Sequence, residues 1–278
     1  AGPPPPDDWR PVGEAFASQA AVALERAALA DEARAAWERV EAEFLRNTLL
    51  SGVSHDLRTP LAAITGAVST LLDAGDRLQP VARDGMLRTA YAEACRMERL
   101  IRNLLDMTRL ESGGLQLRRE WLSVQEVVGS ALRHVESLLR ERAVTVDVPA
   151  SLPLVMMDSV AVEQVLVNLF QNAAEYTPAG SPVEVTARAS EAEVILVVAD
   201  RGPGLAAGLE GRVFEKFFRA PVPGGDARTG IGLGLAVCRG VVAAHGGRIT
   251  AANRPGGGAA FTLALPRTGD EPVVDSAA

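Results

Sequence analysis

The sequence predicts two folded parts: a helical hairpin that dimerises into a four-helix bundle, followed by an α+β sandwich. Up to Gly113, apolar residues recur in steps of three and four, which is the periodicity of packed helices. After Gly114 the pattern changes to short strand-like runs mixed with helical segments that do not alternate with them strictly. Hydrophobic residues make up 47% of the chain and aromatics only 4%, an Ala-, Leu- and Val-rich balance that suits helices.

The first helix is expected to begin near Pro11 and to continue beyond Arg46, because the segment between them is rich in alanine and has no proline or glycine after Gly13. Four apolar residues farther along lie seven apart, as in a coiled coil or a helix bundle. These residues are Leu50, Leu57, Ile64 and Leu71. Gly75 and Pro80, within "DAGDRLQP" (73–80), are expected to end this helix.

A second helix carries an apolar stripe and is expected to end at Gly113 and Gly114 as a C-terminal cap. The stripe comprises Leu87, Ala90, Ala94, Met97, Ile101, Leu104 and Thr108. Two long helices with a short connection form an antiparallel hairpin, and a single hairpin buries such a stripe poorly. Two hairpins paired around a two-fold axis would bury it, so the sequence predicts a homodimer.

The second part of the chain predicts the elements of a sandwich. A capping box in "SVQE" (123–126) is expected to begin a helix that runs to about Glu141. Further helices are expected at 159–176 and in "LAVCRGVVAAHGG" (235–247), and strands at 144–148, 152–157, 183–189, 193–200, 247–253 and 259–266. The chain after Pro266 has the composition of a disordered tail, and "AGPPPPDDW" that of a linker.

Charge and cysteine content exclude several classes of protein. A formal net charge of -7 and a pI near 5.2 argue against a surface that wraps nucleic acid. Cys95 and Cys238 lie far apart without metal-ligand spacing, so we expect reduced thiols and a cytoplasmic setting. The sequence has no charge-free apolar run of the roughly 18 residues that a membrane helix needs, and no signal peptide at its N-terminus.

The stretch "SHDLRTPL" (54–61) places a concentration of polar chemistry inside a predicted helix. His55 and Thr59 share one face, about 200° from the apolar position Leu57, so His55 is expected to face solvent. A neutral imidazole can accept a phosphoryl group, and Asp56 could hold its other N–H. Pro60 removes one helical hydrogen bond and is expected to bend the helix. The alternative is a surface His–Asp pair on a kinked helix, whereas His134 and His245 have the settings of structural residues.

Two glycine-rich signals, "DRGPG" (200–204) and "GIGLG" (230–234), fit neither a Walker loop nor a dinucleotide-binding fingerprint. Asp200 ends a buried strand, where a carboxylate needs a partner such as an adenine amino group. Gly232 and Gly234 would let backbone amides and a helix N-terminus approach phosphates. Asn168 and Asn172 share one helical face, where they bond to neighbouring backbone or supply oxygen to a hard cation such as Mg²⁺.

The boxes "SHDLRTPL", "NLFQNAAEYTP", "DRGPG", "FEKFFR" and "GIGLGLAVCRGVVAAHGG" occur in the order of the H, N, G1, F and G2 boxes of sensor histidine kinases. The chain resembles that family from about residue 47 to 266. "GGGAAF" (256–261) is similar to its last glycine box, with Ala259 where threonine is common. "SHDLRTPLAAI" and "AVCRGVVAAHGG" are similar to the potassium-responsive, Kdp-type members, and the N-terminal helix resembles the exit helix of a GAF-type input domain.

The resemblance implies a Bergerat-type (GHKL) ATP-binding α/β sandwich of the kind found in DNA gyrase and Hsp90. Asn172 would hold Mg²⁺, Asp200 would read adenine, and Asn168 stands where ATP-hydrolysing relatives place a catalytic glutamate. Glu175 replaces a frequent lysine, for which a second cation could compensate. The remaining cofactor-binding residues implied are Gly202, Gly204, Lys216, Arg219, Gly230, Gly232, Gly234 and Leu235.

The resemblance further implies a domain order and an activity. Residues 1–46 would be linker and signalling helix, 47–112 the dimerisation and phosphotransfer domain, 113–267 the catalytic ATP-binding domain, and 268–278 a disordered tail. The homodimer would phosphorylate His55 from Mg-ATP, pass the phosphoryl group to an aspartate of a response regulator, and use Thr59 to dephosphorylate that regulator. Membrane contact would come only from input segments absent here, and residues 219–229 would form a mobile lid. The alternatives are a Bergerat-fold ATPase or clamp and a non-catalytic dimeric scaffold.

Overall fold

The computed structural model describes residues 9–74, 77–112, 116–219 and 231–267 of the 278-residue chain. It divides into two compact units, Ala1–Thr59 and Pro60–Ala278, and each is described by itself below. The expected tail (268–278) and most of the expected lid lie outside the described residues, as do Gly113 and Gly114.

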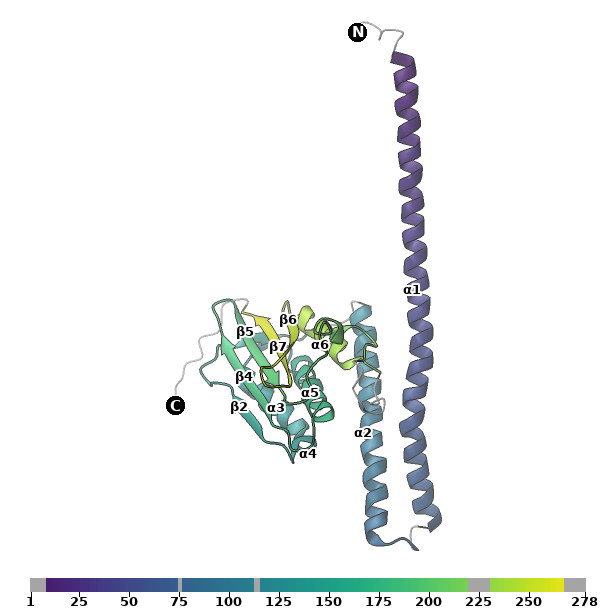
Figure 1. Cartoon of the computed structure of the whole chain (residues 1–278). Coiled ribbons are helices and arrows are strands. Elements are labelled where there is room, and N and C mark those ends of the chain that lie inside the picture. The colour runs from purple at the N-terminus through teal and green to yellow at the C-terminus, as the bar shows by residue number, and fades with distance from the viewer. Residues whose placement is uncertain (1–8, 75–76, 113–115, 220–230, 268–278) are drawn as a thin grey trace. The chain divides into compact units, whose positions relative to one another are not determined.

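The first unit consists of the long helix α1 (Trp9–Ala74), which continues into the second unit (Figure 1). The helix is uninterrupted over 66 residues and contains Pro60, at the boundary between the units. A single long helix here confirms the prediction from the alanine-rich sequence, whereas the bend at Pro60 stays a prediction. Large apolar side chains near its N-terminus, including Phe16 and Leu24, are exposed in the single chain.

The second unit opens with a helical hairpin, in which the end of α1 is followed by α2 (Pro80–Glu111). Pro80 occupies the first turn of α2, where its missing N–H costs no hydrogen bond. The helix ends at the C-cap residue Ser112, one position before the predicted glycine cap.

The apolar stripe predicted on α2 is divided between two faces of the helix. Ala90, Met97 and Leu104 are half-buried and belong to the same seam as the buried Leu100 and Met107. The other predicted members are exposed in the single chain, and these are Leu87, Ala94, Ile101 and Thr108. The single chain thus leaves half of the stripe uncovered, as expected for a hairpin that buries it only in a dimer, and the dimer interface stays a prediction.

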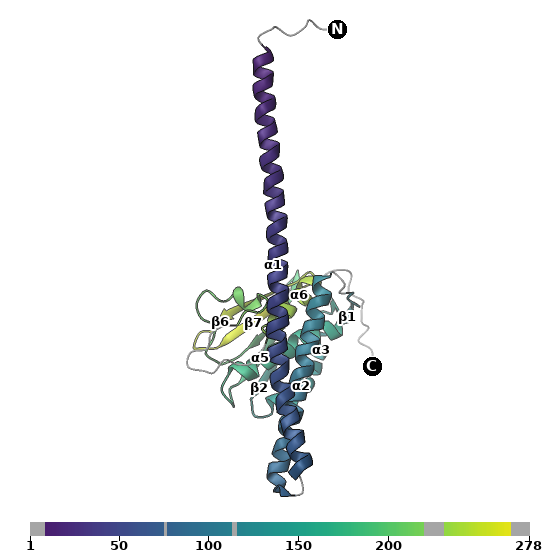
Figure 2. The same ribbon diagram turned by 90° about the vertical axis from the view of Figure 1, so that its right-hand side faces the viewer.

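The rest of the second unit is an α/β sandwich with one layer of helices on a five-stranded sheet (Figures 1 and 2). The sheet has the order β2-β4-β5-β7-β6, with β2 and β4 parallel and the other pairs antiparallel. The strands are β2 (Val144–Asp147), β4 (Val183–Ala189), β5 (Glu193–Ala199), β6 (Arg248–Asn253) and β7 (Ala259–Pro266). The helices are α3 (Val124–His134), α4 (Glu136–Leu139), α5 (Ser159–Tyr176) and α6 (Gly234–Ala244), with a short 3₁₀ turn, η2, at Arg212–Phe214.

The core lies between the sheet and helix α5. Leu166, Leu169 and Phe170 of α5 have no exposed surface, and neither do Val185 of β4 and Leu263 of β7. Burying each such side chain contributes about 1.5–3 kcal/mol. The sandwich thus has its own hydrophobic core, which holds the ends of β5 and α5 in fixed positions.

Two local predictions about this domain were wrong, and one short strand was missed. A second sheet pairs β1 (Glu120–Leu122) antiparallel with β3 (Val155–Met157), and β1 was not expected. The helix that begins after Ser123 ends at His134, and α4 follows as a separate turn. Ser123 is the N-cap residue, but its side chain makes no capping hydrogen bond, so the predicted capping box does not form.

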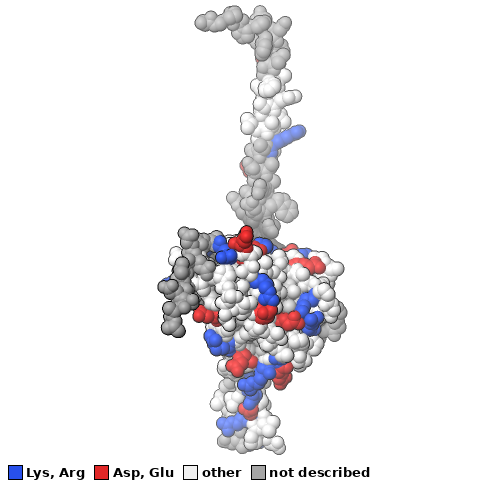
Figure 3. Space-filling model, turned by 90° about the vertical axis from the view of Figure 1, so that its left-hand side faces the viewer, with Lys and Arg blue, Asp and Glu red and all other residues white. Residues whose placement is uncertain are grey.

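The surface of the sandwich carries interspersed charges of both signs (Figure 3). Several form ion pairs between strands, such as Arg188 with Asp147 and Arg248 with Glu193. On the face shown, neither sign of charge forms a continuous patch. Among the described helices, no segment is both long enough and apolar enough to cross a membrane.

His245 joins the end of α6 to the start of α5. Its Nε2 accepts a hydrogen bond from the Asp158 amide at 3.0 Å, and its Nδ1 lies 2.8 Å from the Val241 carbonyl oxygen. Nδ1 must therefore carry the proton and the imidazole must be neutral. Asp158 also caps α5, because its Oδ1 accepts from the Ala161 amide. Burial lowers the pKa of the His245 imidazole, and the nearby Arg119 acts in the same direction.

The sandwich should lose stability at mildly acidic pH through His245. The folded-state pKa of His245 is lowered, so the unfolded chain binds the extra proton first, and stability falls as the pH drops below about 6.5. We expect the loss to approach about 1 kcal/mol, the net value of one buried hydrogen bond. Urea unfolding of wild type and His245→Gln between pH 8 and pH 5 measures it. Equal pH slopes in the two proteins would contradict the assignment.

Candidate active site

Asp200 stands at the end of β5 with only 6% of its surface exposed. Its Oδ1 accepts hydrogen bonds from the backbone amides of Gly202 at 2.8 Å and Ala259 at 3.2 Å. Its own amide donates to the Ala259 carbonyl oxygen at 2.9 Å. Among the described residues, Oδ2 takes part in none of these bonds and receives no other. The carboxylate is therefore held in one orientation with one oxygen left for a donor such as an amino group.

Glycine is required in the loop after Asp200 because the loop is packed closely on its neighbours. A Cβ on Gly202 would lie 3.0 Å from Cγ2 of Thr177 and 3.1 Å from Oδ1 of Asp200. Gly204 has a φ of +75°, and a Cβ there would lie 2.5 Å from Oδ1 of Asn253. The loop thus presses against the end of α5 on one side and the end of β6 on the other.

The second glycine signal is tied to the segment that precedes the expected lid. Gly232 has a φ of +72°, and a Cβ there would lie 2.7 Å from the Phe218 carbonyl oxygen. Phe217 itself has a φ of 62°, a conformation that is costly for a bulky residue, and its amide donates to the Gly232 carbonyl oxygen at 3.0 Å. Gly230 lies outside the described residues.

Helix α6 begins at Gly234, so its first backbone amides have no helical partner and can bind an anion. Leu235 follows in the first turn and is half-buried. The structure thus places Gly234 at the start of a helix, and its predicted contact with phosphates stays a prediction.

Asn168 and Asn172 lie on one face of α5 but have different surroundings. Asn168 is 4% exposed and its amide is used within the protein. Its Nδ2 donates to the Gly234 carbonyl oxygen at 3.4 Å and approaches Sγ of Cys238 at 3.7 Å, and its Oδ1 accepts from Gln164 at 3.2 Å. Asn168 therefore fastens α5 to the start of α6, while Asn172, one turn farther, is half-buried.

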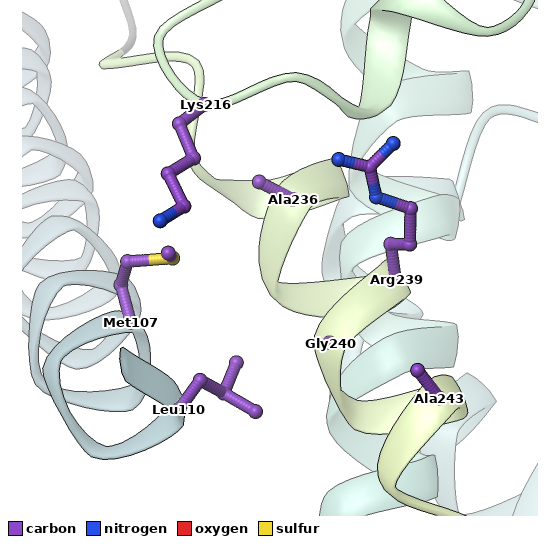
Figure 4. A pocket seen from close by; sticks show the side chains of 7 residues that line it. All are labelled: Met107, Leu110, Lys216, Ala236, Arg239, Gly240 and Ala243. Carbon is purple, nitrogen blue, oxygen red and sulfur yellow. The ribbon is translucent and has the colours of Figure 1, made fainter. Parts of the chain in front are cut away.

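The cations suggested as phosphate ligands, Lys216 and Arg219, are both exposed, as is Glu175. Lys216 borders a mainly apolar pocket between α2 and α6 (Figure 4). The other residues lining this pocket are Met107, Leu110, Ala236, Arg239, Gly240 and Ala243. In Figure 4 the ammonium group of Lys216 points toward Met107, so the pocket belongs to the packing of α2 on α6 and is separate from Asp200.

His55, Asp56 and Thr59 share the last turns of α1 in the first unit. Asp56 is half-buried and Thr59 is exposed, whereas the side chain of His55 lies outside the described residues. The helix places Thr59 one turn beyond His55, which agrees with the predicted shared face.

Residues that support Asp200 were not predicted from the sequence. Arg254 donates to the Asp200 carbonyl oxygen at 3.2 Å, and Asn253 bonds to the backbone of Leu205. Gly258 has a φ of +97°, and a Cβ there would lie only 2.0 Å from the Asp200 carbonyl oxygen. The sequence signal for Gly258 is its place in "GGGAAF", whereas Asn253 and Arg254, at the end of β6, belong to no motif.

Two family descriptions match the chain in the order of its two domains. Residues 45–113 match the "His Kinase A (phospho-acceptor) domain". Residues 157–269 match the "Histidine kinase-, DNA gyrase B-, and HSP90-like ATPase". The first match contains His55, Asp56 and Thr59, and the second contains Asn172 and Asp200.

Sequence relatives include the sensor protein KdpD of Escherichia coli, 42% identical over 258 residues. That alignment covers 91% of this chain but 28% of the relative, so the chain spans little more than a quarter of its length. Among solved structures, the histidine kinase AdeS of Acinetobacter baumannii gives a TM-score of 0.58 at 25% identity, over 77% of this chain and 98% of that one. Full-length ShkA in complex with AMPPNP gives 0.58 at 26% identity, over 81% of this chain and 47% of that one.

The described geometry and these similarities agree. A helical phospho-acceptor segment comes first, and a sandwich with an oriented buried aspartate between glycine loops comes second. The chain belongs to the sensor histidine kinases, of which it carries the phospho-acceptor domain and the ATP-binding domain.

Proposed function

We propose that the chain is the kinase core of a sensor histidine kinase, which phosphorylates His55 from Mg-ATP and then serves an aspartate of a response regulator. The observation that carries this proposal is Asp200, a buried carboxylate with one oxygen fixed by backbone amides and one left over. An exocyclic amino group, such as that of adenine, is the donor that completes its hydrogen bonding.

The residues around Asp200 fit an adenosine nucleotide. Gly202 and Gly204 keep side chains away from the base, and the start of α6 at Gly234 offers free amides to the phosphates. Asn172 would hold Mg²⁺ through its amide oxygen, since this cation prefers oxygen and shares its coordination with substrate phosphates. The presence of AMPPNP in the related ShkA structure supports a nucleotide at this site. The bound nucleotide supplies the phosphoryl group that His55 accepts.

His55 would act as the nucleophile through a neutral imidazole nitrogen. Asp56, next to it on α1, would hold the other N–H and so fix the tautomer that leaves the reacting nitrogen free. Thr59 is exposed one turn farther along and would orient a water molecule for dephosphorylation of the regulator.

The chain would work as a homodimer, because the hairpin exposes two series of large apolar side chains that a second copy could cover. The exposed side chains are Leu61, Val68 and Leu72 of α1 and Leu87, Tyr91, Ile101 and Leu105 of α2. Each series has helical spacing, so each forms a seam of the kind that packs in a bundle. Residues 1–46 would continue this contact as a signalling helix that follows a GAF-like input region, with 47–112 as the dimerisation domain and 113–267 as the catalytic domain.

Two substitutions distinguish the phospho-acceptor site from the nucleotide site. With γ-labelled ATP, His55→Gln should abolish acid-labile, base-stable label on the protein and leave ATP affinity unchanged, because only the nucleophile is removed. Asp200→Asn should weaken ATP binding about tenfold or more, the loss of a hydrogen bond to a charged group, and so also reduce labelling. His134→Gln is the matched control. Label retained on His55→Gln would refute the assignment, and free phosphate without labelled protein would favour an ATPase or clamp.

Thr59→Ala should separate phosphatase from kinase activity. The hydroxyl is too weak a base to activate His55, so autophosphorylation should stay within about twofold of wild type, whereas loss of phosphate from the regulator should slow about tenfold or more. Following the labelled regulator with time measures both. If Thr59 only shapes the helix before Pro60, both activities change together or neither does, and the phosphatase role is wrong.

The dimer can be tested on the exposed seam of α2. Ile101→Glu places a charge in the proposed interface twice, once from each copy, and should raise the dimer dissociation constant by about tenfold or more. Sedimentation across a concentration series measures this constant. Ala92→Glu adds the same charge on the opposite side of α2, where Ala92 is exposed, and should change nothing. A wild-type chain that is monomeric at micromolar concentration would contradict the proposal.

A further inference from the structure

The last residue of β6, Asn253, and the next residue, Arg254, hold the loop 200–205 from both of its ends. At the first end, Nη1 of Arg254 donates to the Asp200 carbonyl oxygen at 3.2 Å, and Nη2 pairs with Glu184 of β4 at 2.7 Å. The Arg254 side chain is 16% exposed and the Glu184 side chain 33%, so this pair is shielded from water more than most ion pairs of the domain. Such a charge-assisted bond restrains the peptide of Asp200 more firmly than a solvent-exposed pair would.

At the other end of the loop, Asn253 makes a two-point contact with the backbone of Leu205. Its Oδ1 accepts from the Leu205 amide at 2.6 Å, and its Nδ2 donates to the Leu205 carbonyl oxygen at 2.8 Å. Gly204 makes this approach possible, because a Cβ there would lie 2.5 Å from Oδ1 of Asn253. A side-chain amide that satisfies both polar groups of one residue fixes its position as a strand partner would.

Arg254 is itself fixed by its backbone. Its amide donates to the Gly258 carbonyl oxygen at 2.9 Å, and its carbonyl oxygen accepts from Gly257 at 3.1 Å. Gly258 in turn packs against the carbonyl of Asp200. Arg201 adds a second guanidinium to Glu184 at 3.3 Å. The guanidinium that holds Asp200 is thus carried by a tight turn and anchored to a neighbouring strand.

We infer that Arg254, together with Asn253, is a positioning residue for adenine recognition: the two side chains set the loop 200–205 so that the free Oδ2 of Asp200 meets the exocyclic amino group of the base. The inference rests on the proposed role of Asp200 as the residue that reads adenine. Arg254 does not touch the nucleotide in this arrangement. It acts by restricting the position of Asp200, to which a hydrogen bond of good geometry is sensitive.

The experiment compares ATP with purine riboside triphosphate, which lacks only the 6-amino group of the base. The affinity ratio of the two nucleotides, measured by calorimetry on the full chain, reports the contact with that amino group alone. Wild type should prefer ATP by about tenfold or more, and Asp200→Asn should abolish most of that preference. Arg254→Met should lower the ratio by about threefold or more, chiefly by weakening ATP.

Arg248→Met is the matched control. Arg248 also pairs with a glutamate across the sheet, Glu193, at 2.5 Å and 2.7 Å, but at the opposite end of β6 from Arg254. Its replacement should leave the ratio as in wild type. Glu184→Gln provides a second variant that weakens the hold on Arg254 without removing a large side chain, and it should shift the ratio in the same direction by a smaller factor.

The outcomes separate the inference from the function on which it rests. A wild-type protein that does not distinguish the two nucleotides overturns the adenine role of Asp200, and this inference with it. If Asp200→Asn loses the preference while Arg254→Met and Glu184→Gln keep the wild-type ratio, the role of Asp200 stands and the positioning role is wrong. Equal weakening of both nucleotides in Arg254→Met would also overturn it, because a residue that only supports the fold lowers both affinities together.

Discussion

The burial of one carboxylate governs the second half of this structure. Asp200 is nearly removed from water, and an ionised group in that setting is stable only if hydrogen bonds replace its hydration. The amides of Gly202 and Ala259 supply two of them, which requires the loop after β5 to turn back sharply and the start of β7 to come close. A Cβ on Gly258 would collide with the Asp200 carbonyl, so the glycines of two separate boxes are consequences of the same contact.

The start of α6, where phosphates are proposed to bind, is held in place by a hydrogen bond between α5 and α6. The amide of Asn168 donates to the carbonyl of Gly234, and a carboxylate at this position could only repel that oxygen. An asparagine thus suits a residue that holds the start of α6, and its amide cannot serve as a general base for hydrolysis. Burial raises the pKa of the neighbouring Cys238 thiol to about 12, so this sulfur stays protonated and is not a nucleophile. Transfer to a histidine rather than to water is consistent with such a site.

The sequence predicted a helix or strand correctly where the pattern of residues within that element was sufficient to define it. Helix α5 was predicted with its observed limits, and the structure shows that Asp158 caps its first turn. Strands β4 and β7 were predicted equally well from alternating or continuous apolar runs. Strand β1 was not predicted, because its three residues form a strand only by pairing with β3, which is distant in the sequence. Asn253 and Arg254 were missed for the same reason, since a polar residue at the end of a strand acquires its role only from the residues that the fold brings beside it.

Helix α2 shows why a repeating pattern alone could not settle its packing. Its steps of three and four describe both half-buried residues, such as Met97 and Leu104, and exposed ones, such as Ile101. A contact toward α6 depends on Leu110 and on a glycine in the middle of the opposite helix. A Cβ on Gly240 would lie 2.6 Å from Cδ1 of Leu110, and a helical glycine costs about 1 kcal/mol relative to alanine. Gly240 leaves room for the side chain of Leu110. The ATP-binding domain therefore contains a residue that packs against the helical hairpin, in addition to its nucleotide site.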